Sequence, residues 1–106
     1  MYSILVVRDK RKVGKITLTP PFPARKRRDA HLDHDRVLLE RKGEYWVLTI
    51  WLGRGTTRSD ITRQDWAGGR IEVDLEVKLK GKILAFAKRR GNGISFLFEE
   101  VKEDGR

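Results

Sequence analysis

The sequence predicts a mainly β fold, a small antiparallel β-barrel or sandwich with one short helix. Apolar and polar residues alternate with a period of two along several segments, as they do in half-buried strands. These segments are short and are separated by glycine or proline turns, a spacing typical of barrels and sandwiches. The chain has 106 residues, of which 39% are hydrophobic, and this suits one small core. We therefore expect a single domain over residues 1–106, with residues 99–106 as a frayed, mixed-charge end.

The first half of the chain contains four expected strands, which cover residues 2–7, 14–19, 36–40 and 44–52. In the second strand, Ile16 and Leu18 share the face that we expect to point into the core. Prolines 20, 21 and 23 exclude regular pairing and predict a loop over residues 20–28. The fourth strand follows a turn at residues 41–43 and is apolar on both faces, which favours a central position in the sheet.

The second half begins with a loop over residues 53–58 and a short helix. Ser59 is the expected N-cap of this helix, which runs to Trp66 and ends at two glycines. Residues 70–80 alternate most regularly, which predicts one strand whose core-facing residues are Ile71, Val73, Leu75, Val77 and Leu79. Gly81 is the expected turn into a strand over residues 83–88. A glycine-rich turn at 91–93 leads into a last strand over 94–101, with an inward face made by Ile94, Phe96 and Phe98.

The composition excludes several classes of protein. The absence of cysteine excludes disulfides, thiolate zinc sites and thiol nucleophiles. No apolar run reaches the roughly 20 residues of a membrane helix, and the N-terminus does not resemble a signal peptide. We therefore expect a cytoplasmic protein without a membrane partner. With Asn92 and Gln64 as the only side-chain amides, the composition resembles that of proteins from hot environments.

The positive charge is concentrated in one stretch of the chain. Residues 8–28 contain nine basic residues and one acidic residue, so they carry +8 of the formal net charge of +9. A concentrated positive field attracts polyanions and speeds their encounter, which favours a nucleic-acid partner. Two alternatives stay open: a solubilising surface, and a subunit that docks on an acidic protein.

The candidate nucleic-acid contacts are basic residues, most of them on expected turns and loops. Arginine suits this role because its planar guanidinium pairs with two phosphate oxygens at once. The set comprises Lys10, Arg11, Lys12, Lys15, Arg25, Lys26, Arg27, Arg28, Arg54, Arg58, Lys88, Arg89 and Arg90. Trp46, Trp51 and Trp66 are candidate stacking platforms for unpaired bases, although we expect at least two of them to pack in the core.

Both histidines lie in an acidic run over residues 29–35. His31, His34 and Asp33 are the candidate catalytic residues, because two imidazoles and a carboxylate can bind a manganese or zinc ion that activates water. The run also balances the positive charge of residues 25–28, and this second interpretation is favoured. We therefore expect no metal and no cofactor.

The order of several motifs resembles the 3′-phosphoesterase domain family of bacterial DNA ligase D. The motifs are Gly43-Glu44-Tyr45, the strand to Trp51, Arg54-Gly55-Thr56, Gly69-Arg70-Ile71-Glu72, Leu79-Lys80-Gly81-Lys82, Lys88-Arg89-Arg90 and Phe96-Leu97-Phe98. The resemblance implies a small β-barrel and a manganese-dependent activity on 3′ ends, with His31 at the place of a phosphate-binding histidine. The positions of the family's metal ligands hold Asp9, Lys15 and Thr17 here, and an ammonium at Lys15 would repel a cation. The resemblance therefore implies the barrel and its basic groove without the metal site.

Together these features predict a β-barrel that binds nucleic acid, DNA or RNA, through its phosphate backbone with little sequence preference and without catalysis of its own. DNA repair or end processing, beside a repair-protein partner, is the expected setting. The alternative is a metal-dependent 3′-phosphoesterase that acts on DNA or RNA ends.

Overall fold

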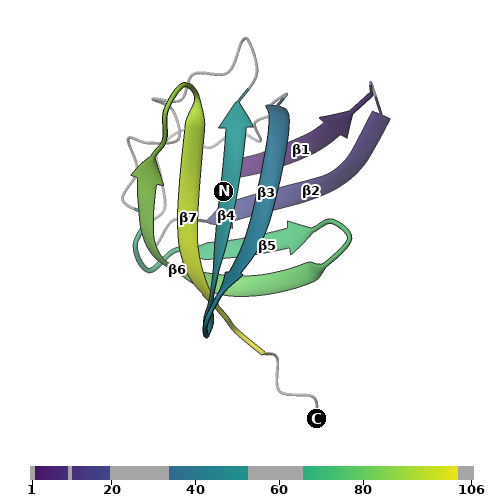
Figure 1. Cartoon of the computed structure of the whole chain (residues 1–106). Helices are drawn as coiled ribbons and strands as arrows, with labels where there is room; N and C mark the ends of the chain where they lie inside the picture. The colour runs from purple at the N-terminus through teal and green to yellow at the C-terminus, as the bar shows by residue number, and fades with distance from the viewer. Residues whose placement is uncertain (1, 10, 20–33, 53–65, 103–106) are drawn as a thin grey trace.

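Alternating apolar residues bring the strands of this chain into one antiparallel sheet (Figure 1). The computed structural model describes residues 2–9, 11–19, 34–52 and 66–102. In these ranges the sheet has seven strands, in the order β1-β2-β5-β6-β7-β4-β3. Their bounds are β1 Tyr2–Arg8, β2 Arg11–Thr19, β3 His34–Lys42, β4 Tyr45–Leu52, β5 Arg70–Asp74, β6 Lys78–Lys88 and β7 Gly93–Glu100. The prediction of a mainly β, antiparallel fold is confirmed.

The core lies on the inner face of this strongly bent sheet. Every described strand contributes to it, with Trp66 joining from the turn before β5. Its fully buried side chains are Ile4, Ile16, Leu18, Leu48, Ile50, Trp66, Ile71, Val73, Ile83, Ile94, Phe96 and Phe98. The core positions that alternation predicts for Ile16, Leu18, Ile94, Phe96 and Phe98 are confirmed.

The single strand expected over residues 70–80 is a hairpin instead. β5 ends at Asp74, residues 75–77 form a bend, and β6 begins at Lys78, which pairs with Asp74 across the ladder. Ile71, Val73 and Leu79 are buried as expected, but Leu75 only packs at the edge of the core and Val77 is 45% exposed. The alternation continues through the bend because both strands direct apolar side chains to the same core.

Gly81 does not turn the chain, contrary to the prediction, and lies inside β6. A Cβ atom at this position would stand 2.4 Å from the Phe98 ring and 2.6 Å from the carbonyl oxygen of Glu99. Glycine is therefore required because β7 passes close by. β6 pairs with β5 over residues 78–82 and with β7 over residues 81–88, so it connects the two halves of the sheet.

The sheet stays open between its two edge strands. β1 and β3 lie near each other, but in the ranges that the structure describes they share no ladder. An apolar cleft of about 540 Å³ lies at this seam, lined by Val6, Val13, Val37, Leu39, Trp46, Leu75, Glu76 and Val77. The seam separates β1–β2 from the β3–β4 hairpin, whose outer face carries the site described below.

Two other expectations concern the segments around these strands. The expected helix falls mostly on residues 59–65, outside the described residues; its last residue, Trp66, lies in a turn in which Gly69 donates a backbone hydrogen bond to the Trp66 carbonyl (2.8 Å). The first residues of the expected frayed end are ordered: β7 extends to Glu100, and Val101 donates a backbone hydrogen bond to the Lys80 carbonyl (2.8 Å). Residues 103–106 of that segment lie outside the described residues. No helix in the described part of the chain has the length and hydropathy to cross a membrane.

Candidate nucleic-acid interface

Trp51 and Arg36 form a stacked pair on the outer face of the sheet. They are direct neighbours in the β3–β4 register, and Trp51 in turn pairs with Gly93 of β7. The guanidinium carbon of Arg36 lies 4.1 Å from the centre of the Trp51 ring, within the range of a cation–π interaction. Arg36 is exposed and Trp51 is half-buried, so the pair faces solvent.

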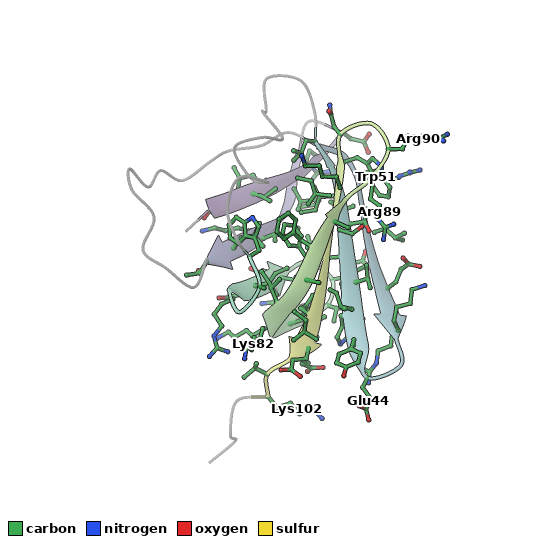
Figure 2. The ribbon with its side chains drawn as sticks, turned by 90° about the vertical axis from the view of Figure 1, so that its left-hand side faces the viewer. Glu44, Trp51, Lys82, Arg89, Arg90 and Lys102 are labelled. Carbon is green, nitrogen blue, oxygen red and sulfur yellow. The ribbon has the colours of Figure 1, made fainter. Side chains whose placement is uncertain are left out.

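Gly93 lets Trp51 and Arg89 approach each other across β7. A Cβ atom on Gly93 would lie 3.0 Å from Nε1 of Trp51 and 2.8 Å from Cβ of Arg89. The backbone nitrogen of Arg89 also donates to the Gly93 carbonyl (2.7 Å), which fixes the end of β6 beside β7. The indole therefore lies against the Gly93 backbone, beneath Arg36 and near Arg89. Figure 2 shows Trp51, Arg89 and Arg90 at the same end of the molecule.

A buried pair of hydroxyls orients Arg89. The Oγ1 atom of Thr49 and the Oγ atom of Ser95 are hydrogen-bonded at 2.8 Å, and both residues are buried although they lie on the outer face. Nε of Arg89 donates to the Oγ atom of Ser95, also at 2.8 Å. This contact restrains the arginine side chain along the sheet.

Trp51, Arg36, Arg89 and Thr49 line a shallow groove of about 670 Å³, which we call the outer-face groove. Its lining comprises Arg36, Leu38, Glu40, Lys42, Val47, Thr49, Trp51, Arg89, Arg90 and Gly91. Four of these residues are cationic and one is acidic, and the carboxylate of Glu40 lies 3.8 Å from the Lys42 ammonium. Leu38 is 44% exposed and gives the groove an apolar patch. The groove thus combines positive charge with an aromatic ring and aliphatic surface.

Four lysines on the outer face of β2 and β6 have acidic neighbours instead, whereas Arg70 of β5 lies opposite Thr19 and Lys82. Lys15 lies directly opposite Asp74, Lys80 opposite Glu72, and Lys82 opposite Glu99. Lys78 also lies 3.6 Å from Asp74. Opposite charges across a ladder stabilise the sheet and reduce the field that a polyanion would feel. In the outer-face groove, by contrast, Arg36 and Arg89 lie beside Trp51 and Gly93.

The predicted basic residues are distributed over several parts of the molecule. Arg89 and Arg90 line the groove, and Lys88 ends β6 beside them. Arg11 and Lys12 are exposed at the start of β2, and the β1–β2 turn lies on a different side of the molecule from the β6–β7 turn (Figure 1). The remaining candidates, Lys10, Arg25, Lys26, Arg27, Arg28, Arg54 and Arg58, lie outside the described residues.

The described residues do not assemble a metal site. His34 is the first residue of β3, where its backbone pairs with Leu52, while His31 and Asp33 lie outside the described residues. In the four described ranges, no group of three His, Asp or Glu residues could hold an ion. Of the positions that resemble metal-ligand positions of the phosphoesterase family, Lys15 and Thr17 lie on the outer face of β2, opposite Asp74 and Glu72.

The three tryptophans have different environments. Trp66 is fully buried and makes an edge-to-face contact with Phe96 at 6.1 Å between ring centres. Trp46 packs against the core, and its Nε1 donates to a carboxylate oxygen of Glu100 at 3.4 Å. Two of the three therefore pack in the core, as expected, and Trp51 alone of the three lines the outer-face groove.

Sequence analysis missed two cations of the groove, Lys42 and Arg36, and Arg36 is the one that contacts Trp51. Arg36 has no basic neighbour in the chain, so a search for clusters of basic residues does not find it. The register of the β3–β4 hairpin, set by the turn at Gly43 with its positive φ of 64°, places Arg36 opposite Trp51. A prediction of that register from the turn at Gly43 could therefore have identified Arg36 as a neighbour of Trp51.

No family model matches the chain, and neither a curated protein nor a solved structure matches it.

Proposed function

We propose that the protein binds nucleic acid through the outer-face groove, mainly by phosphate contacts with little sequence preference, and has no catalytic activity of its own. One observation carries the proposal: Arg36, Arg89 and Arg90 line one groove with Trp51, and the single carboxylate of this groove, Glu40, lies 3.8 Å from the Lys42 ammonium. In the cell such a protein would hold a DNA or RNA end for another protein, such as a repair enzyme, to process.

The chemistry of the groove supports a polyanion as the ligand. Arginine guanidinium groups form paired hydrogen bonds with phosphate oxygens, and they lose less hydration than ammonium groups when they do so. The +8 charge of residues 8–28 adds a long-range field that steers a polyanion toward the protein.

A salt titration with two triple variants tests the proposal. One variant carries Arg36→Gln, Arg89→Gln and Arg90→Gln in the groove, and the matched control carries Lys78→Gln, Lys80→Gln and Lys82→Gln on the outer face of β6. Both lose three positive charges, so a general charge effect would be equal in the two. Figure 2 shows Lys82 well away from Arg89 and Arg90.

We expect the groove variant to lose affinity for every sequence alike and the control to keep most of it. For each phosphate that the variant no longer neutralises, the slope of log K against log salt should become shallower by about 0.9 on duplex DNA and by about 0.7 on a single strand. Equal losses in the two variants, with circular dichroism showing that both fold, would contradict a role for the groove.

The same samples test the catalytic alternative. DNA with a 3′-phosphate or a 3′-ribonucleotide, incubated with the protein and manganese or zinc, should keep its 3′ end. Turnover that is abolished by EDTA and by His31→Ala would replace the binding function with a 3′-phosphoesterase.

A further inference from the structure

We infer that the ligand of the outer-face groove is single-stranded nucleic acid, and that one unpaired base stacks on Trp51 in the place now held by Arg36. This inference rests on the proposed function and adds the kind of nucleic acid and the residue that recognises it.

The first argument is the geometry of the stacked pair. A planar guanidinium 4.1 Å from the ring centre occupies the position that a stacked base takes on an aromatic side chain. Arg36 is exposed and lies on an edge strand, so it can move aside without disturbing the core. The indole keeps its place because its Nε1 edge lies against Gly93, close to Arg89. Displacement of Arg36 therefore uncovers a ring that is already oriented.

The second argument is the fate of Arg36 after it moves. A base on Trp51 brings its own phosphate within the groove, and a released guanidinium can pair with that phosphate. Arg89, directly after β6 and restrained by the Oγ atom of Ser95, lines the same groove near Trp51. The exchange replaces one cation–π contact with a stacking contact and a charge-assisted hydrogen bond.

The third argument is the apolar surface of the groove. Leu38 is 44% exposed there, and Val47 and Trp51 are partly exposed beside it. In a duplex the faces of the bases are covered by stacking, and the phosphates that it presents gain no favourable contact from aliphatic surface. Unpaired bases present apolar faces next to their phosphates, and proteins bind them with this combination of aromatic and basic groups. An acidic protein segment would use the cations but would leave the Trp51 ring without a specific role.

Four probes at one salt concentration near 0.15 M test the inference by fluorescence anisotropy. The first probe is an oligothymidylate of about 12 nucleotides, a length within the site size of one OB-fold module. The others are a hairpin duplex with the same number of phosphates, an abasic strand of the same length, and an oligoglutamate. The protein variants are Trp51→Leu and Trp51→Phe. Trp46→Phe is the control, because Trp46 lies in the same hairpin, also beneath an arginine, but packs against the core.

We expect oligothymidylate to bind at least about tenfold more tightly than the hairpin or the abasic strand, the difference that one stacked base provides. Trp51→Leu should reduce its affinity to that of the abasic strand, Trp51→Phe should have an intermediate effect, and Trp46→Phe should have none. In the Trp46→Phe protein, binding should also quench the tryptophan emission, and this quenching should disappear when Trp51 is replaced as well.

The base-stacking proposal and the phosphate-binding proposal would be contradicted by different results. If the abasic strand or the hairpin binds as tightly as oligothymidylate, and the groove triple variant still weakens all of them, stacking is refuted and phosphate binding stands. If oligoglutamate binds in the groove and no oligonucleotide depends on it, both proposals are refuted in favour of an acidic protein partner.

Discussion

On the outer face of the sheet, the buried hydroxyls of Thr49 and Ser95 hold Arg89 of the proposed binding surface. The two hydroxyls are buried and bond to each other, and Ser95 also accepts a hydrogen bond from Arg89. A buried hydroxyl that loses its partner keeps the cost of leaving water without the gain of a new bond. The pair therefore contributes both to stability and to the position of a surface arginine.

A double-mutant cycle measures this contribution at the residue scale. Ser95→Ala leaves the Thr49 hydroxyl without the partner that the structure shows, and we expect it to lower the free energy of unfolding by about 1–3 kcal/mol. Thr49→Val alone should cost less, because the Ser95 hydroxyl keeps the hydrogen bond from Arg89. The double variant should cost less than the sum of the two losses, because both hydroxyls are then gone. Urea denaturation of the four proteins gives the coupling energy. Additive losses would mean that the two hydroxyls act independently.

Sequence predicts single residues well where one pattern decides their place. Ile16 and Phe96 follow strict alternation within their strands, and both are fully buried. Arg36 escapes such a prediction because its role depends on Trp51, a neighbour 15 positions away that only the strand register brings near. Cross-strand contacts of this kind are not visible in the local sequence.

At the scale of elements, sequence analysis found the strands but misjudged one connection. The β5–β6 bend has no glycine, proline or asparagine, and apolar residues continue at every second position through it. Local turn chemistry therefore gave no signal there. Gly81, which carries the turn signal, serves instead for the close approach of β7.

Two identical substitutions distinguish the hairpin from a continuous strand. Val73→Ala removes a side chain that is 1% exposed, and Val77→Ala removes one that is 45% exposed in the bend. We expect the first to lower the free energy of unfolding by about 2 kcal/mol and the second by well under 1 kcal/mol. The midpoints of chemical denaturation compare them directly. Equal losses of stability would support the continuous strand over residues 70–80, because that strand places both valines in the core.

At the scale of the whole molecule, the charge distribution creates two separable contributions to binding. The groove supplies short-range contacts, and residues 8–28 supply most of the net charge. Opposite charges across β2, β5 and β6 show that a positive total does not by itself define a binding surface. For this reason the candidate site could be predicted only in part from composition.

Replacement of Arg25, Lys26, Arg27 and Arg28 by Gln separates these contributions. We expect weaker binding across all sequences at low salt, a slower association rate and a shallower salt slope, because four charges of the steering field are removed. Stopped-flow association at several salt concentrations measures all three quantities. An unchanged slope would show that this segment does not touch phosphate.

The order of strands in the sheet also determines when the protein can fold during its synthesis. β7, the last of the described strands, lies between β6 and β4, and in the described residues it alone joins the β3–β4 hairpin to the other strands by hydrogen bonds. A nascent chain that ends at Asn92 can pair β1, β2, β5 and β6, but its β3–β4 hairpin has no strand to join it to them, and an isolated hairpin is marginally stable in water. Its core also lacks Ile94, Phe96 and Phe98. We expect ribosome-bound chains to remain sensitive to protease until residues 93–100 have left the exit tunnel, and then to become resistant in one step. Protection of shorter nascent chains would show that β1–β6 form a stable sheet without β7.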